Sequence, residues 1–243
     1  MRQKLLHEIL ADIISAMSFP VTFKTAVDNG NGTYTLGKIC DLHHLTPAQD
    51  ITINSKKYTV KDYQPDGDKW KIIIEKNIDQ ATIEPLPTAP QTFQLDGPFF
   101  CHGTPIEQNA ELEKITVDEK TPMIYLMEPY DTEVDHNEES SIGHRVMATL
   151  CFLSQAQTEK WQTDDFYHNA ILPMINLMND LFDAIEASQL FYFQKQKTEP
   201  KYYTKFGINI QGLGTKKLYM SEKLSGVGTK QRFEIYRVES CEC

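Results

Sequence analysis

The side chains of this chain that are best suited to chemistry are its histidines, cysteines and clustered carboxylates. A zinc site would have to draw on a set of five residues: Cys40, His43, His44, Cys101 and His102. Structural zinc sites usually pair their ligands as C-x₂₋₄-C or H-x₃₋₅-H, and these residues are not spaced in that way. The adjacent positions of Cys101 and His102 also rarely allow both to bind one ion. We therefore expect loop residues and a buried thiol here, with no metal site.

Carboxylates gather between residues 128 and 139, where hard oxygen ligands could bind Ca²⁺. The calcium-loop pattern D-x-D-x-D-G is absent, and no glutamate follows at the required offset. We expect residues 130–141 to form an acidic loop that faces solvent or a partner.

Motifs for covalent or phosphate chemistry are missing. The sequence has no G-x-S-x-G, no H-E-x-x-H and no P-loop. Two G-x-G triplets, at residues 212–214 and 226–228, do not open a helix after a strand and are interpreted as turns in a sheet. We expect a protein that is not an enzyme and that uses no cofactor.

Basic residues concentrate near the C-terminus. Residues 195–237 hold ten Lys or Arg against three Glu, in a chain whose net charge is −10. Aromatic residues surround the segment 195–205, a combination that suits nucleic acid through phosphate contacts and base stacking. The alternative is a sheet edge that its lysines keep soluble. A basic sheet on an acidic body also suits an acidic protein partner or head-to-tail contacts between copies.

Two apolar runs and one long helix dominate the second half. Residues 121–129 and 146–153 are typical of strands buried on both faces. Residues 164–188 form a predicted helix with a kink or a break near 169–172, because Pro173 cannot donate a backbone hydrogen bond. Its apolar face repeats at spacings of three and four: Tyr167, Ile171, Met174, Met178, Leu181 and Ile185.

The first half predicts a helix over residues 3–17 and then short strands separated by turns, such as the Asn-Gly pairs at 29–32. The proline cluster at 84–98 marks a boundary. We expect an α+β protein. Residues 1–84 form a helix and a small antiparallel β-domain, 85–98 a linker, and 99–243 an antiparallel or mixed sheet with a long helix packed across it.

Composition indicates a globular protein without a membrane span. No apolar stretch approaches the ~20 residues that a membrane helix needs. Glu8 and Asp12 interrupt what would be the apolar core of a signal peptide. Five cysteines without framework spacing argue against a disulfide scaffold. We expect the chain to be made, and to mature, in a cytoplasm.

Roughly residues 98–238 resemble neck proteins of tailed phages, such as those of Bacteroidetes phages and prophages, including crAss-like phages. The resemblance rests on the order of elements and on packing segments at residues 103–105 (Gly-Thr-Pro), 109–112 (Asn-Ala-Glu-Leu), 122–128 (Pro-Met-Ile-Tyr-Leu-Met-Glu) and 171–174 (Ile-Leu-Pro-Met). It implies a fold like that of tail terminators or head–tail joining proteins.

The resemblance implies a structural protein of the virion that assembles as a homo-oligomeric ring in the host cytoplasm. The ring would join the portal or an adaptor to the tail, close to packaged DNA, and would contact no membrane. We expect an acidic group to face a basic group of the neighbouring subunit: Glu128, Asp131, Glu133 and Asp135 against Lys216, Lys217, Lys230 and Arg232. The alternative is a monomeric intracellular module that binds nucleic acid or protein through residues 195–237.

Overall fold

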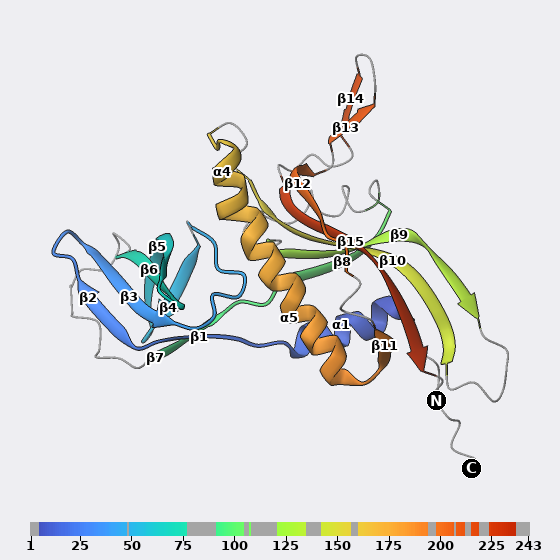
Figure 1. Cartoon of the computed structure of the whole chain (residues 1–243), viewed down its shortest axis with the longest axis horizontal. Helices are drawn as coiled ribbons and strands as arrows, with labels where there is room; N and C mark the ends of the chain where they lie inside the picture. Colours follow the sequence, from blue (N-terminus) through green and yellow to red (C-terminus); the bar gives the residue numbers. More distant parts are fainter. Residues whose placement is uncertain are drawn as a thin grey trace, which may run out of the picture. The chain divides into compact units, whose positions relative to one another are not determined.

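The computed structural model divides the chain into two units. It describes residues 5–47, 49–76, 91–104, 107, 121–134, 142–156, 160–193, 198–206, 208–211, 215–218 and 224–236. The larger unit comprises Met1–Met17 and Pro98–Cys243, and the smaller unit comprises Ser18–Gly97. Figure 1 labels the elements of both units. The α+β class expected from the sequence is confirmed.

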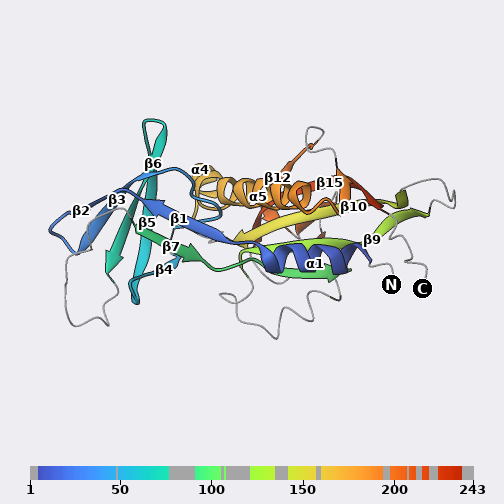
Figure 2. The same cartoon turned by 90° about the horizontal axis from the view of Figure 1, so that it is seen from below.

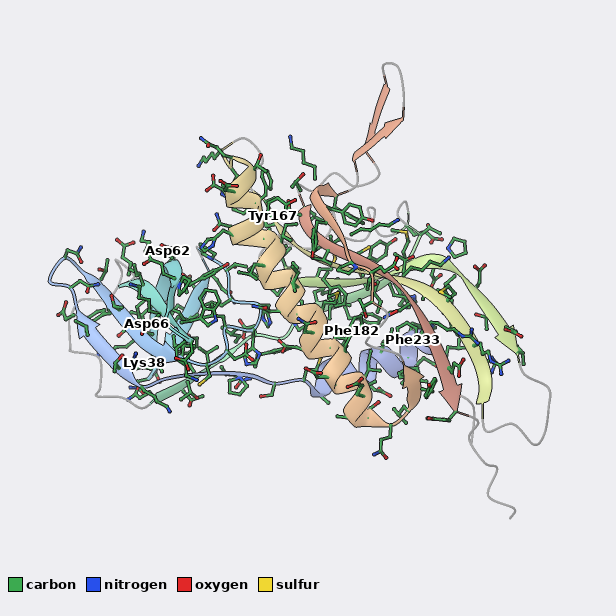
Figure 3. All side chains as sticks on the ribbon, in the orientation of Figure 1. Lys38, Asp62, Asp66, Tyr167, Phe182 and Phe233 are labelled. Atoms are coloured by element: carbon green, nitrogen blue, oxygen red, sulfur yellow. The ribbon has the colours of Figure 1, made fainter. Side chains whose placement is uncertain are left out.

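The smaller unit is built from antiparallel strands. Five of them form a sheet in the order β2 (Thr25–Asp28), β3 (Thr33–Ile39), β6 (Lys69–Lys76), β5 (Lys56–Asp66) and β4 (Asp50–Ile53). A second sheet pairs β1 (Phe19–Phe23) with β7 (Gln91–Leu95). The turn between β2 and β3 places Gly30 and Gly32 at φ 74° and 80°, which confirms the predicted Asn-Gly turn. Lys38 and Asp66 form a surface ion pair at 3.3 Å (Figure 3).

The division of the chain differs from the expected domains in two respects. Residues 91–95, expected in a linker, form strand β7 and pair with β1; residues 85–90 lie outside the described residues. Helix α1 (Leu6–Ala16), expected to accompany the small β-domain, belongs to the larger unit, where it contacts β8 and α5. The apolar side chains of α1 are covered by these distant segments. Local periodicity does not specify which segment a helix packs against.

The larger unit contains a mixed sheet in the order β11 (Phe191–Phe193), β15 (Leu224–Tyr236), β10 (Ile142–Gln155), β9 (Met123–Val134) and β8 (Phe99–Gly103). Strand β12 (Lys201–Phe206) also pairs with β15, while β13 (Ile208–Gln211) and β14 (Thr215–Leu218) pair with each other. Strands β8 and β9 run parallel, and the remaining pairs are antiparallel. Figure 2 shows the same elements after a quarter turn.

One face of this sheet is covered by a long helix. Its segments are α4 (Thr163–Phe166), a π-helical turn (Tyr167–Ile171) and α5 (Leu172–Ser188). The irregularity expected before Pro173 is this π turn. The predicted apolar face is buried from Ile171 to Ile185, but Tyr167 is 45% exposed and Phe166 is buried in its place. A π turn holds an extra residue, so the positions before it are rotated away from the stripe.

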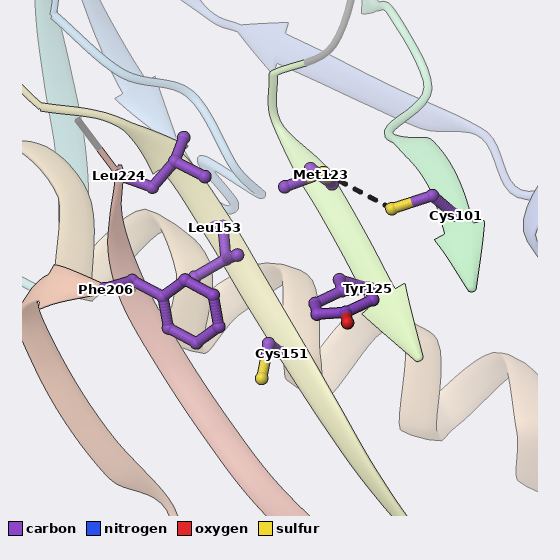
Figure 4. Packing of buried hydrophobic residues seen from close by; sticks show 7 residues of the cluster. All are labelled: Cys101, Met123, Tyr125, Cys151, Leu153, Phe206 and Leu224. Atoms are coloured by element: carbon purple, nitrogen blue, oxygen red, sulfur yellow. Dashed lines mark hydrogen bonds between the residues drawn. The ribbon is translucent and has the colours of Figure 1, made fainter. Parts of the chain in front are cut away.

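The opposite face carries a second apolar cluster (Figure 4). It contains Cys101, Met123, Tyr125, Cys151, Leu153, Phe206 and Leu224. The hydroxyl of Tyr125 donates to the carbonyl oxygen of Gly103 at 2.8 Å. Strands β9 and β10 are thus buried on both faces along this half of their length, as their unbroken apolar runs predicted.

The cysteines of the described part differ sharply in exposure. Cys40 is exposed, whereas Cys101 and Cys151 are buried. Burial raises the pKa of the Cys151 thiol to about 12, so this residue stays protonated up to pH 9, and the thiolate is the reactive form. In the native protein at pH 8 we expect iodoacetamide to modify Cys40 and to spare Cys151, as measured by peptide mass spectrometry. Equal labelling before and after unfolding would contradict this expectation.

Thr104 and Glu107 form a capping box. The Thr104 backbone N–H and hydroxyl donate to the Glu107 carboxylate at 3.1 and 2.7 Å, and the Glu107 N–H donates to the Thr104 hydroxyl at 3.4 Å. The hydroxyl bond, followed by the backbone bond, lowers the pKa of Glu107.

Candidate functional site

The predicted acidic loop is in large part a strand. Strand β9 continues to Val134 and pairs with residues 144–147 of β10, so Asp131 and Glu133 are exposed strand residues. The prediction of a loop beginning at residue 130 was wrong, because Asp and Glu are infrequent in strands but are tolerated on an exposed one. Asp135 lies outside the described residues.

The outer edge of β9 is only partly covered. Strand β8 pairs with Met123 to Met127 and ends there. From Glu128 to Val134, no strand of the described chain pairs with β9 on that side. The backbone N–H and C=O groups of such an edge are available to another strand. This edge carries Glu128, Asp131 and Glu133, and we call residues 128–134 the acidic edge.

Charged residues of three strands lie side by side on the sheet face opposite the long helix. The register places Arg145 of β10 between Glu133 of β9 and Glu234 of β15. Its guanidinium group lies 3.6 Å from the Glu133 carboxylate and 3.9 Å from the Glu234 carboxylate. Arg232 lies 2.8 Å from Glu234. Glu133 and Arg232, which were expected to face a neighbouring subunit, therefore each have a partner of opposite charge within their own sheet, Arg145 and Glu234.

The predicted basic residues fall in two different places. Lys230 and Arg232 are exposed on β15, where they oppose Thr149 and Met147 of β10. Lys216 and Lys217 lie on β14, which belongs to the separate β13–β14 hairpin; their side chains are outside what the structure describes. Asp131 and Arg232 lie on the two strands that flank Met147, so Arg232 is close to the acidic edge. The hairpin lysines lie on a strand that is not part of this sheet.

Glu128 does not behave as a free interface residue. Its carboxylate lies 3.0 Å from Nδ1 of His102, and its side chain is 32% exposed. His102 in turn stacks on His7 of α1, with ring centroids 4.2 Å apart. No sequence pattern predicted this contact, because the whole smaller unit separates His7 from His102 in the chain.

A second surface feature is an open groove of about 470 Å³ beside the π turn. It is lined by Asp164, Tyr167, His168, Ile171, Leu172, Ile175 and Tyr202. Tyr167 and Tyr202 are 45% and 50% exposed, and their rings meet edge to face at 6.3 Å. Exposed tyrosines that offer both apolar area and a hydroxyl are typical of protein contacts. Periodicity had placed Tyr167 in the core, so this groove was not predicted.

Nothing in these surfaces resembles a catalytic constellation of nucleophile and base among the described residues. No helix in that part of the chain combines the length and the apolar character that a membrane span requires. Comparison with models of known families, with curated proteins and with solved structures finds no match to this chain.

Proposed function

We propose that this chain is a structural subunit of a phage virion, which forms a homo-oligomeric ring in the neck between portal and tail. The observation that carries the proposal is the acidic edge, with which no strand of the described residues pairs on the outer side of β9, in a sheet that has one face covered by a long helix. A sheet with a helix across it is also the architecture that the phage resemblance implies.

The charge of the edge favours a particular type of contact. Two acidic edges brought together in a symmetric pair would place like charges opposite each other, which is destabilising. A basic segment of a neighbouring copy is a better partner, and β14 with Lys216 and Lys217 supplies one. Such a contact is heterologous, and heterologous contacts generate closed rings when the rotation between copies closes.

Charge reversal at the edge tests this contact. We expect the double substitution Asp131→Lys and Glu133→Lys to weaken self-association at least about tenfold at low salt, because like charges facing across an interface cost several kcal/mol. Reversing Lys216 and Lys217 to Glu in the same chain should restore part of the loss. Sedimentation velocity at low and at high salt measures both effects.

The matched control is Glu186→Lys, an exposed residue of α5 that lies away from β9 in the sequence and on another element. It changes the net charge in the same direction and should leave association unchanged. Assembly that is insensitive to reversal at the edge and at the hairpin would exclude the acidic edge as the contact.

The function itself is tested by mass spectrometry of virions or induced prophage particles from the source of this gene. A ring subunit should be present at an abundance comparable to that of the portal protein. Its absence from particles would contradict the proposal. Salt-sensitive retention of the purified chain on DNA would then favour the alternative module that binds through residues 195–237.

A further inference from the structure

We propose that His7, His102 and Glu128 form a binding site for a divalent transition-metal ion, of which Zn²⁺ is the first choice. One ligand atom from each of these residues lies within 4.8 Å of the other two. The three residues come from α1, β8 and β9 of the larger unit. The inference is independent of the proposed ring function, and it assigns to Glu128 a role other than contact between subunits.

The donor set fits this class of ion. Two imidazoles and one carboxylate are a known zinc ligand set, and imidazole also suits Ni²⁺, Cu²⁺ and Fe²⁺. Calcium and magnesium, which require oxygen ligands, are not matched by two histidines. The paired spacing of common structural zinc sites does not occur among these residues, because they are distributed over three elements and converge only in the folded unit.

Binding of an ion requires at least one of the three side chains to move. Ligands at about 2.1 Å from a tetrahedral zinc ion lie roughly 3.4 Å from one another. His102 Nδ1 and Glu128 Oε1 are already 3.0 Å apart. The His7 ring stacks on the His102 ring at an interplanar angle of 18°. An imidazole nitrogen binds a metal ion in the plane of its ring, so one ring has to turn out of the stack before both can bind the same ion.

The surroundings permit binding and entry. The Nδ1 atom of His7 is buried and has no hydrogen-bond partner among the described residues, so no bond at that atom has to be broken for the ring to turn. The His102 side chain is 42% exposed, which gives an ion a path from solvent. Three protein ligands leave a fourth position for water or another donor.

The ion would have a structural consequence. It would link α1 to β8 and β9. In the sequence, α1 is separated from these strands by the entire smaller unit. A metal cross-link that closes such a long loop reduces the conformational entropy of the unfolded chain. A bound ion therefore stabilises the larger unit in which α1 is packed.

Calorimetric titration of the full chain with ZnCl₂ tests the proposal, after the exposed thiols have been alkylated to prevent their binding zinc. The titration should show one Zn²⁺ equivalent that is lost in His7→Ala and in His102→Ala. Because outer-shell partners alone are worth roughly 10- to 100-fold in metal affinity, loss of a direct ligand should weaken binding by at least about 100-fold. The control His144→Ala, on β10, should bind as the unmodified sequence does.

A further variant and a folding control complete the test. Glu128→Gln keeps the size and hydrogen-bonding capacity of the side chain but removes its charge, so it should also lose the tight equivalent. Far-UV circular dichroism without metal should be the same for all variants, which separates lost ligation from lost folding. A stoichiometric Zn²⁺ that survives all three ligand substitutions, or no Zn²⁺ binding by the unmodified sequence, would overturn the site.

Discussion

Replacing Phe182 with alanine is expected to destabilise the larger unit by about 3–5 kcal/mol, the usual cost of removing a buried phenylalanine. Phe182 lies on the face of α5 that packs on the sheet and is 1% exposed (Figure 3). Its ring meets that of Phe152 of β10 edge to face at 6.1 Å. Because both rings are fully buried, neighbouring side chains cannot collapse into the space without moving the helix.

The two tryptophans of the chain allow this loss to be assigned to one unit. Trp161, whose ring lies 5.5 Å from that of Phe166, reports on the larger unit, and Trp70 of β6 reports on the smaller. In a Trp70→Phe background, urea unfolding followed by Trp161 fluorescence should show the reduced stability of Phe182→Ala.

The control for this substitution is Glu186→Ala, which changes an exposed position of the same helix and should alter stability by no more than about 0.5 kcal/mol. A Phe182→Ala midpoint equal to that of the control would mean that the helix does not stabilise the sheet through this contact.

Gly226 of β15 is expected to tolerate no side chain. The substitution Gly226→Ala should lower the free energy of unfolding by about 3 kcal/mol or more, at the upper end of overpacking effects. Gly226 opposes Leu153 of β10 and Tyr203 of β12. A Cβ atom there would overlap the backbone carbonyl oxygen of Phe152. Backbone in a central strand cannot shift without breaking its ladder of hydrogen bonds.

Gly228, two residues further along β15, provides the matched comparison. A Cβ atom at this position would come within 2.8 Å of the Tyr203 ring and 3.4 Å of the Cys151 sulfur. These are side-chain atoms, and the partly exposed Tyr203 can turn aside. Gly228→Ala should therefore cost only about 1 kcal/mol. Equal losses for the two variants in Trp161-monitored unfolding would show that the backbone clash at Gly226 is relieved.

These contacts also explain one of the two G-x-G triplets of the sequence. The prediction that residues 226–228 form a turn is wrong, because they lie inside strand β15. The close approach of the β10 backbone requires glycine at position 226, whereas Gly228 lies against the Tyr203 side chain. The triplet at 212–214 lies outside the described residues, between β13 and β14.

Local periodicity by itself determined the elements whose pattern repeats within a few residues. Helix α5, the apolar strands β9 and β10, helix α1 and the turns of the smaller unit were all predicted, because i, i+3, i+4 spacing, unbroken apolar runs and Asn-Gly pairs specify local backbone geometry. The exception within a predicted element is Tyr167. One extra residue in the π turn rotates it out of the core, and the sequence pattern of apolar residues is compatible with either arrangement.

Tertiary structure decided everything that depends on pairing between distant segments. Strand β7 forms because residues 91–95 find β1, and α1 joins the larger unit because its apolar face meets β8 and α5. The same long-range packing brings His7 onto His102 and ends the pairing of β8 with β9 at Met127. Such contacts are selected by the burial of apolar surface across the whole unit, and no spacing within a short segment encodes which partner each surface meets.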